Sequence, residues 1–378
     1  MKKGWQTKKL GDVCAFLNRG MSPVYLDEGG LCVLNQKCIR DHEVNYEPSR
    51  RHDSKAKKVA EERIIRLGDV LVNSTGTGTL GRVAQVRDEP DEVTTVDSHV
   101  TIVRPKPGLF HLDFFGYMLV VIEDAIKEAG EGCGGQTELA RSVLADRFSV
   151  CYPNSLPEQQ RIVGILDAAF EGLATAKANA EKNLLNARAL FDSHLQAVFS
   201  QRGKGWVEKP FEDCIEDVKY TTKIQRKEFL GDGEFPIVSQ EADFINGYWD
   251  NAADVFKVTR PVVIFGDHTQ VLKYIDFDFV LGADGVKVLP PKSFLNPKFF
   301  FYSLRSAPVK SLGYSRHYRL LKELQISYPD TGKQVEIANH FDALDEESQR
   351  LAAIYQKMLA ALESLKKSLL HQAFSGEL

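Results

Sequence analysis

Two long stretches of the chain carry apolar residues at alternating steps of three and four. The first begins near Pro157 and the second near Gln334, and each runs for about forty residues without an internal proline. This spacing is typical of a coiled-coil seam, and two such helices within one chain are expected to pair antiparallel. The alternative is that each helix packs only on its own neighbouring segment. The expected seam residues are Leu166, Leu173, Leu184, Leu195, Phe341, Leu344, Leu351, Leu362 and Leu365.

The two stretches are copies of each other. Residues 159–200 align with 334–375 at a constant offset of 175 without a gap, and 13 of these 42 positions are identical. Gly4-Trp5 and Gly205-Trp206 open the segments that precede them. The chain therefore reads as a pseudo-twofold internal repeat, because one register is kept throughout. The predicted segments are block one (1–154), a central helix (155–203), block two (204–330) and a C-terminal helix (331–378).

The two blocks show a shorter periodicity, in which strand-like runs precede a helix-like run. In block one the strand-like runs are 69–73, 82–86 and 99–104, and the helix-like run is 114–128. In block two they are 261–265, 271–275 and 285–289, followed by 297–304. Each block ends in a similar strand-like run, 148–153 and 324–329. The pattern predicts an α+β protein in which two mixed α/β domains are separated by a long antiparallel two-helix coiled coil.

Composition and charge exclude several classes of protein. The 378 residues include 48 Lys and Arg against 52 Asp and Glu, a net charge of −4, which excludes a histone-like basic coat. No apolar run approaches a membrane span and no signal peptide opens the chain, so we expect a cytoplasmic protein with no membrane partner. The six cysteines form no C-x-x-C pair, and no metal site is expected.

Gly76-Thr77-Gly78-Thr79-Leu80-Gly81 matches the G-x-G-x-x-G dinucleotide motif. That motif requires a helix to begin at the glycines, whereas residues 82–87 alternate like a strand. A glycine-rich hairpin is the better interpretation, and residues 265–269 occupy the matching place in block two. A nucleotide-dependent enzyme using this loop remains an alternative hypothesis.

Catalytic signatures are scarce in this sequence. It contains no Walker motif, no H-E-x-x-H, no G-x-S-x-G and no methyltransferase N-P-P-[YF]. Asp267 and His268 are adjacent and could act as general bases, although such a pair in a turn more often contacts a ligand or caps the turn.

Basic residues cluster despite the acidic total. One group spans residues 50–58 and fits either phosphate binding or a solvated surface. Another spans 314–322 and mixes Arg, His, Tyr and Ser, side chains that suit phosphates and base edges. Its counterpart in block one is the polar, glycine-bearing segment 134–137.

The whole pattern resembles the specificity subunit of type I restriction–modification systems. The residues that carry this resemblance are Leu156-Pro157-Glu158-Gln159-Gln160-Arg161-Ile162-Val163, which open the first long helix, and Ala373-Phe374-Ser375-Gly376-Glu377-Leu378, which close the chain. The second copy departs from the first at Asp330-Thr331-Gly332-Lys333.

The resemblance implies a noncatalytic subunit that binds double-stranded DNA. Each block would be a target recognition domain that reads one half of a split sequence, and the helices would set the gap between the halves. Two modification subunits would carry S-adenosylmethionine, and restriction subunits would use ATP and Mg²⁺, so no cofactor is expected in this chain. A coiled-coil adaptor that binds other proteins is the remaining alternative.

The resemblance and the chain order together predict two sets of DNA-contacting residues. In block one these are Arg19, Ser22, Lys37, Arg40, Asn73, Ser74, Thr75, Thr77 and Gln136. In block two they are Lys219, Tyr220, Ser239, Gln240, Asp267, His268, Thr269, Ser315, Arg316, His317 and Tyr318.

Overall fold

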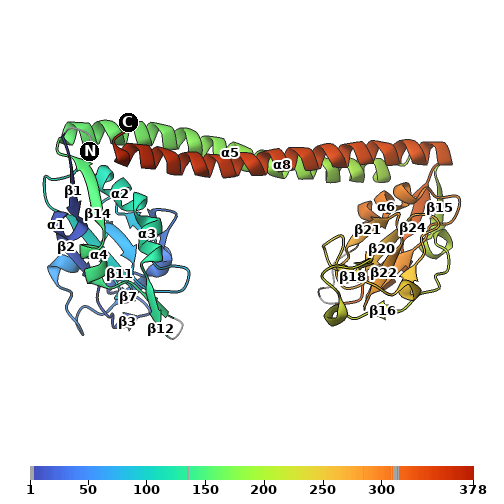
Figure 1. Ribbon diagram of the computed structural model, residues 1–378, viewed down its shortest axis with the longest axis horizontal. Helices are drawn as coiled ribbons and strands as arrows, with labels where there is room; N and C mark the ends of the chain where they lie inside the picture. The colour runs from blue at the N-terminus through green and yellow to red at the C-terminus, as the bar shows by residue number, and fades with distance from the viewer. Residues whose placement is uncertain (1–3, 134–135, 284, 308, 310–312, 314) are drawn as a thin grey trace. The chain divides into compact units, whose positions relative to one another are not determined.

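A computed structural model describes residues 4–133, 136–283, 285–307, 309, 313 and 315–378 (Figure 1). Two helices of 45 residues each, α5 (Leu156–Ser200) and α8 (Thr331–Ser375), lie within the predicted helical segments. The chain divides into two compact units, and each long helix contributes to both of them. Unit 1 comprises Met1–Asn179 and Met358–Leu378, and unit 2 comprises Ala180–Lys357. In each unit a block therefore packs together with parts of both long helices.

Block one contains two four-stranded sheets. The first is antiparallel, in the order β2-β11-β8-β9, with β2 (Cys14–Arg19), β11 (Val100–Pro105), β8 (Val70–Asn73) and β9 (Val83–Gln85). The second has the order β10-β4-β7-β3, with β10 (Thr94–Val96), β4 (Leu31–Leu34), β7 (Arg50–His52) and β3 (Tyr25–Leu26). Strands β10 and β4 run parallel, and the other pairs of this sheet run antiparallel.

Shorter elements complete block one. The predicted helix over 114–128 is interrupted at Ile122, giving α2 (Leu112–Val121) and α3 (Glu123–Glu128). The closing strand β14 (Ser149–Pro153) pairs antiparallel with β1 (Trp5–Lys9), immediately before α5. The remaining elements are α1 (Leu10–Val13), α4 (Arg141–Asp146), the hairpin β5 (Ile39–Arg40) with β6 (Glu43–Val44), the hairpin β12 (Glu131–Cys133) with β13 (Gln136–Glu138), and two 3-10 turns at Gln36–Cys38 and Glu61–Arg63.

Block two is built in a similar way. One sheet has the order β21-β20-β23, with β21 (Leu272–Ile275), β20 (Val262–Gly266) and β23 (Val286–Leu289). The other has the order β16-β22-β17-β18, with β16 (Lys223–Ile224), β22 (Phe279–Gly282), β17 (Phe235–Val238) and β18 (Gly247–Trp249), and β19 (Val255–Phe256) also pairs with β22. The closing pair is β15 (Val207–Pro210) with β24 (Gln325–Tyr328), the helices are α6 (Pro297–Ser306) and α7 (Tyr318–Lys322), and 3-10 turns lie at Phe211–Cys214, Arg226–Glu228 and Ala252–Asp254.

Two runs of paired strands recur in both blocks. The order β11-β8-β9 in block one recurs as β23-β20-β21 in block two, and both runs are antiparallel. The order β10-β4-β7 recurs as β22-β17-β18, in each case a parallel pair followed by an antiparallel one. Blocks with little sequence in common therefore share a strand arrangement.

Each block is joined to its helix by the same glutamine. The Gln159 side chain is buried, accepts a hydrogen bond from the His111 amide at 2.8 Å, and donates to the Leu109 and Pro153 carbonyls. Its repeat partner is also buried: Gln334 accepts from the Asn296 amide at 2.7 Å and donates to two carbonyls. Those carbonyls belong to Phe294 and Pro329.

A tyrosine–aspartate contact forms a second joint. The Tyr117 hydroxyl donates to Asp167 at 2.5 Å, and the Tyr302 hydroxyl donates to Asp342 at 2.7 Å. Burial, followed by the neighbouring Asp167 carboxylate, raises the pKa of Tyr117 to about 12. The same tyrosine–aspartate contact therefore joins block and helix in both units, and Asp167 and Asp342 occupy the same position of the repeat.

The start of α8 differs in sequence from the start of α5, and the structure shows how it is capped. The Asp330 carboxylate accepts a hydrogen bond from the Lys333 amide at 3.1 Å. An Asp at this position satisfies one of the amide groups left free at a helix start. The departure from the first copy therefore preserves a working N-cap.

The antiparallel pairing of α5 and α8 is seen within each unit. In unit 1, Leu166 of α5 and Leu370 of α8 share one buried core, and Lys177 forms an ion pair with Glu363 at 2.9 Å. In unit 2, Leu195 and Phe341 are buried in the core that includes block two. Leu173, Leu184, Leu344, Leu351 and Leu362 are partly buried.

The prediction that Leu365 lies in the seam is wrong, because its side chain is 47% exposed. The next residue takes the inward place, and the Lys366 ammonium lies 5.4 Å from the ring centre of Phe170. After Leu362 the seam advances by four residues where we had expected three, and a lysine stem can cover apolar surface. No helix among the described residues is long and apolar enough to cross a membrane.

Candidate nucleic-acid interface

The glycine-rich segment of block one is the turn of a hairpin. Strands β8 and β9 pair antiparallel on either side of it, and no helix begins at the glycines. Gly76 has φ +106°, and a Cβ there would collide with the side chains of Thr79 and Gln36. The geometry required for pyrophosphate binding at a helix N-terminus is therefore missing, and the nucleotide-enzyme alternative is not favoured.

A polar network supports this turn, which we call tip one (residues 73–81). The Gln36 amide donates to the Thr75 hydroxyl at 2.6 Å, and its oxygen accepts from the Thr79 hydroxyl at 3.0 Å. On the other side, Thr75 contacts His99 Nδ1 at 2.7 Å. Thr77 at the turn is exposed. The network holds the turn in one conformation with polar groups toward solvent.

Three separate predicted segments meet at tip one. Thr75 forms an isolated antiparallel bridge with Glu138 of β13, the strand that Gln136 begins. The Arg19 guanidinium pairs with Glu138 at 2.7 Å and donates to the Leu139 carbonyl at 2.8 Å. Arg19 therefore ties β2 to β13. The side chain of Gln136, and Gly134, Gly135 and Tyr314, lie outside the described residues.

Two predicted contact residues of block one are buried. Asn73 is 0% exposed and donates to the Gln36 carbonyl, while Ser74 is 1% exposed and hydrogen-bonded to the Thr101 hydroxyl. The expectation that these side chains touch DNA is corrected here: they lie at the base of the tip and support it. Sequence position alone placed them at the turn, because the strand continues to Asn73.

Block two has an equivalent turn, tip two (residues 266–270), between β20 and β21. The main-chain carbonyl of Gln240 accepts from the Thr269 hydroxyl at 2.6 Å, and its side-chain oxygen accepts from the His268 amide at 3.2 Å. Gln240 stands two residues after β17, as Gln36 stands two residues after β4. A glutamine at the same strand end thus supports both tips, although the tips differ in sequence.

The residues Asp267 and His317 lock tip two onto α7. The Asp267 carboxylate accepts from the Tyr318 amide at 2.7 Å, and its carbonyl accepts from the His317 amide at 2.7 Å. Both side chains are almost fully buried, as is Ser239 at the start of the neighbouring loop. Direct DNA contact by these three is corrected to a supporting role. The Asp267 carboxylate is engaged with a backbone amide, which argues against the general-base interpretation.

The other predicted residues of the described chain remain accessible. Ser22, Lys37, Arg40, Lys219, Tyr220, Thr269 and Arg316 are exposed, and Ser315 and Tyr318 are partly exposed. Tyr220 and Tyr318 are accompanied by cations, with Lys223 4.8 Å and Lys287 5.1 Å from the respective ring centres. Their contact with DNA stays a prediction.

The basic group at residues 50–58 is only partly a solvated surface. His52 is fully buried, and its ring nitrogens contact the backbone of Val24 and Lys57. Arg50 stacks 3.4 Å over the ring centre of Tyr25, and Arg51 forms an ion pair with Glu92 at 2.6 Å. The Arg50–Tyr25 contact joins β7 to β3, and Arg51 joins β7 to the segment before β10, so part of this positive charge stabilises the sheet.

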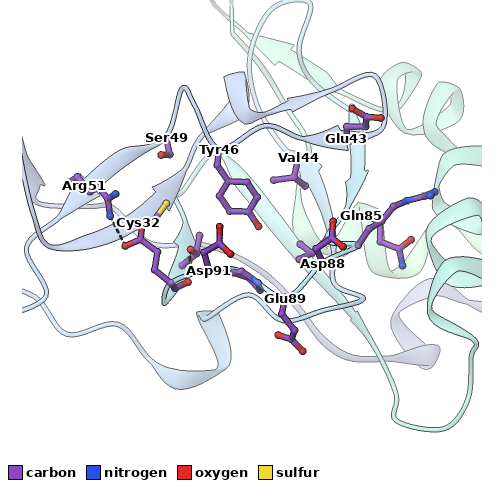
Figure 2. Close-up of a pocket in the computed structure, with 15 residues that line it drawn as sticks. Cys32, Glu43, Val44, Tyr46, Ser49, Arg51, Gln85, Asp88, Glu89 and Asp91 are labelled. Atoms are coloured by element: carbon purple, nitrogen blue, oxygen red, sulfur yellow. Dashed lines mark hydrogen bonds and ion pairs between the residues drawn. The ribbon is translucent and has the colours of Figure 1, made fainter.

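A cavity of about 630 Å³ opens in block one between β7 and the segment after β9 (Figure 2). Five carboxylates and two arginines line the cavity, and none of the predicted contact residues is among its lining residues. The carboxylates belong to Glu43, Asp88, Glu89, Asp91 and Glu92. This charge disfavours phosphate, so the cavity does not extend the candidate interface. Among the described residues no group of three or more His, Cys, Asp or Glu side chains could hold a metal ion.

Sequence reasoning missed Gln36 and His99. The available signal was the position of Gln36 two residues beyond a buried apolar run, matching Gln240 in block two. This match between Gln36 and Gln240 can be recognised only after the apolar runs 31–34 and 235–238 are aligned as equivalent strands.

The sequence and the fold were compared with those of known proteins. Residues 2–186 match the family model described as the type I restriction modification DNA specificity domain. A solved structure described as "Structural basis underlying complex assembly and conformational transition of the type I R-M system" contains a chain with TM-score 0.82 and 16% identity, and the alignment covers 100% of this chain and 99% of that one. The HsdS subunit from Thermoanaerobacter tengcongensis gives TM-score 0.60 and 18% identity, with 100% and 98% covered. No curated protein sequence matches. Residues 2–186 therefore belong to the family of type I restriction–modification DNA specificity domains, and the whole chain has the fold of the solved specificity subunit.

Proposed function

We propose that this specificity subunit reads a bipartite double-stranded DNA target, with one half-site for each block. The observation that carries the proposal is the recurrence of one strand arrangement in both blocks, ending in two different polar tips. Tip one carries Thr75 and Thr77, with His99 beside Thr75, whereas tip two carries His268 and Thr269. Turns of different length and sequence on similar supports suit the reading of different base sequences, most fully in the major groove.

We infer that two modification subunits dock on equivalent faces of the helices. Leu190 and Leu365 occupy the same repeat position, and both are exposed, at 61% and 47%. A leucine kept at an exposed position of both copies has no role in either core. Two equivalent apolar positions suit two copies of one partner, because each copy can make the same contact.

The helices set the distance between the half-sites in this proposal. Each is a continuous 45-residue helix that begins or ends at a block. A continuous α-helix has a fixed rise per residue, so its length can specify a number of base pairs.

Chemistry belongs to the partners in this proposal. S-adenosylmethionine would be bound by the modification subunits, and ATP and Mg²⁺ by restriction subunits, while this chain is noncatalytic and carries no cofactor. With a net charge of −4 it neutralises few phosphates by itself, so partners that close around the duplex would supply much of the affinity.

An exchange of block two tests the proposal. Residues 204–330 are replaced by the corresponding segment of another family member, and the complex with its modification subunits is assayed for methylation of genomic DNA. The expected result is that one half-site changes while the other half-site and the gap stay the same. A change in both half-sites, or in neither, would refute the assignment of one half-site to each block.

A further inference from the structure

An aromatic side chain projects from a surface loop beside tip two. The loop connects β17 to β18, and in it Phe244 is 51% exposed and Ile245 38% exposed. Single exposed apolar residues are ordinary on proteins. This pair is unusual because the loop beneath it is rigidly held.

A buried lysine holds the loop in place. The Lys273 ammonium, on β21, donates to the Asp243 carbonyl at 2.5 Å and to the Asn246 side-chain oxygen at 3.0 Å. It also lies 3.5 Å from the carbonyl of Phe244 itself. The Lys273 residue is only 4% exposed, and removing an ammonium from water is costly. Despite this cost, the three contacts of the ammonium hold the backbone that presents Phe244.

The aromatic ring is positioned as well as its backbone. Phe244 meets Phe277 edge to face, with ring centres 5.9 Å apart. The Asn246 side chain accepts from the Ser239 amide at 2.8 Å and thereby closes the loop on itself. The Phe244 side chain therefore loses little conformational freedom when a partner covers it.

The same loop carries the support of tip two. It begins at Ser239 and Gln240, and Gln240 is bonded to both His268 and Thr269 of the tip. DNA that reaches the tip in the proposed function therefore also reaches the start of this loop.

The size and charge of the exposed pair indicate the kind of partner. Two side chains are far too few for a stable protein interface, which needs about 800 Å² on each side. One aromatic ring is sufficient to stack on a base or to open a base step. Glu241 and Asp243 precede Phe244 in the same loop and repel phosphate, which favours contact with bases over contact with the backbone.

We propose that Phe244, with Ile245 beside it, stacks against the bases of the half-site read by block two, at a base step that opens on binding. This proposal rests on the proposed function and adds to it an apolar side chain that contacts bases, in a segment outside the predicted polar contact residues. Stacking is sensitive to the flexibility of the step, so Phe244 would select for a readily unstacked step within the half-site.

The test uses the full chain assembled with its modification subunits and duplexes that carry its methylated target. 2-Aminopurine is placed in turn at positions of the second half-site, and its fluorescence reports unstacking. The variants are Phe244→Ala, Phe244→Trp as conservative rescue, and Lys273→Met, which releases the loop but keeps the ring. Leu230→Ala is the matched control, because Leu230 is an exposed apolar residue of the same block.

The wild-type and Phe244→Trp complexes should show enhanced fluorescence at one step, which Phe244→Ala abolishes and Lys273→Met reduces. Phe244→Ala should weaken binding by roughly 5- to 150-fold, the range for loss of one stacked aromatic, while Leu230→Ala has no effect. Unchanged affinity and fluorescence in Phe244→Ala would overturn the proposal, as would loss of modification subunits from that variant. Failure of the wild-type complex to discriminate against a scrambled second half-site would instead refute the proposed function.

Discussion

The buried glutamines at the two helix starts allow a paired test of the repeat. Replacing Gln159 or Gln334 with alanine removes one acceptor and two donated hydrogen bonds from a fully buried position. In each case one backbone amide and two carbonyls of the adjoining block lose their partner. The two substitutions are chemically identical and lie 175 residues apart, so each serves as the control for the other.

The expected magnitude follows from the hydrogen bonds lost. Each bond contributes a net of about 1 kcal/mol, and buried groups left without a partner add to the loss. Three bonds per site give a destabilisation of about 3 kcal/mol, which corresponds to a roughly hundred-fold increase in local opening. The pairing of the seam elsewhere is unaffected, because neither side chain belongs to it.

Amide hydrogen exchange measured by mass spectrometry locates the effect. Gln159→Ala should increase exchange at residues 104–122 and 148–160, and Gln334→Ala at 290–306 and 324–338, by similar factors. Each variant should leave the other unit unchanged. A cost below about 0.5 kcal/mol at either site, or exchange spreading to the other unit, would refute the view that each glutamine joins one block to its helix.

Three further predictions concern the loop lysine, the seam and the helix length. Burial lowers the pKa of Lys273 to about 8, whereas its value in the unfolded chain is near 10.5. Between these two pH values the unfolded chain binds the extra proton, so the free energy of unfolding should rise with pH, by about 3 kcal/mol at most. Urea unfolding should show this rise in the wild type and not in Lys273→Met, and parallel pH profiles of the two would contradict it. Leu362→Glu should lower the free energy of unfolding in urea by about 1–3 kcal/mol and Leu365→Glu by less than about 0.5 kcal/mol, since only Leu362 is in the seam. Leu365→Glu should instead weaken copurification of the modification subunits. Equal losses of stability in the two variants would return Leu365 to the seam. Inserting four residues after both Ala180 and Tyr355 adds about 6 Å to each helix, which corresponds to roughly two base pairs of DNA. Methylome sequencing should therefore show a gap between the half-sites that is longer by roughly two base pairs, with both half-site sequences unchanged. An altered half-site would contradict the role of the helices.

The long helices and the main sheet of each block were predictable because their signals are strong and local. Apolar steps of three and four over forty residues located α5 and α8, and alternating runs located β8, β9 and β11. The sheet of block one that contains β4 and the sheet of block two that contains β17 were not predicted from the sequence. Its strands β4 and β17 are four-residue, largely buried runs with parallel neighbours, and such runs lack the alternation that marks a half-exposed strand.

The candidate site was predictable by segment but not by side chain. The segments that the resemblance and the chain order predicted around Arg19, tip one and β13 do meet in the structure. Whether Asn73 points into the protein or out of it depends on strand length, to one residue. The exposure of Leu365 likewise depended on one step of the seam, where a lysine stem replaced a leucine.

The central claim is that this chain alone determines a split DNA target. Its most direct test is methylome sequencing of cells that express the modification subunits with and without this chain. The account predicts that one bipartite methyladenine motif, two short half-sites separated by a fixed unspecified gap, is present with the chain and lost without it. A methylome that is the same in both cells, or a single contiguous motif, would contradict the account.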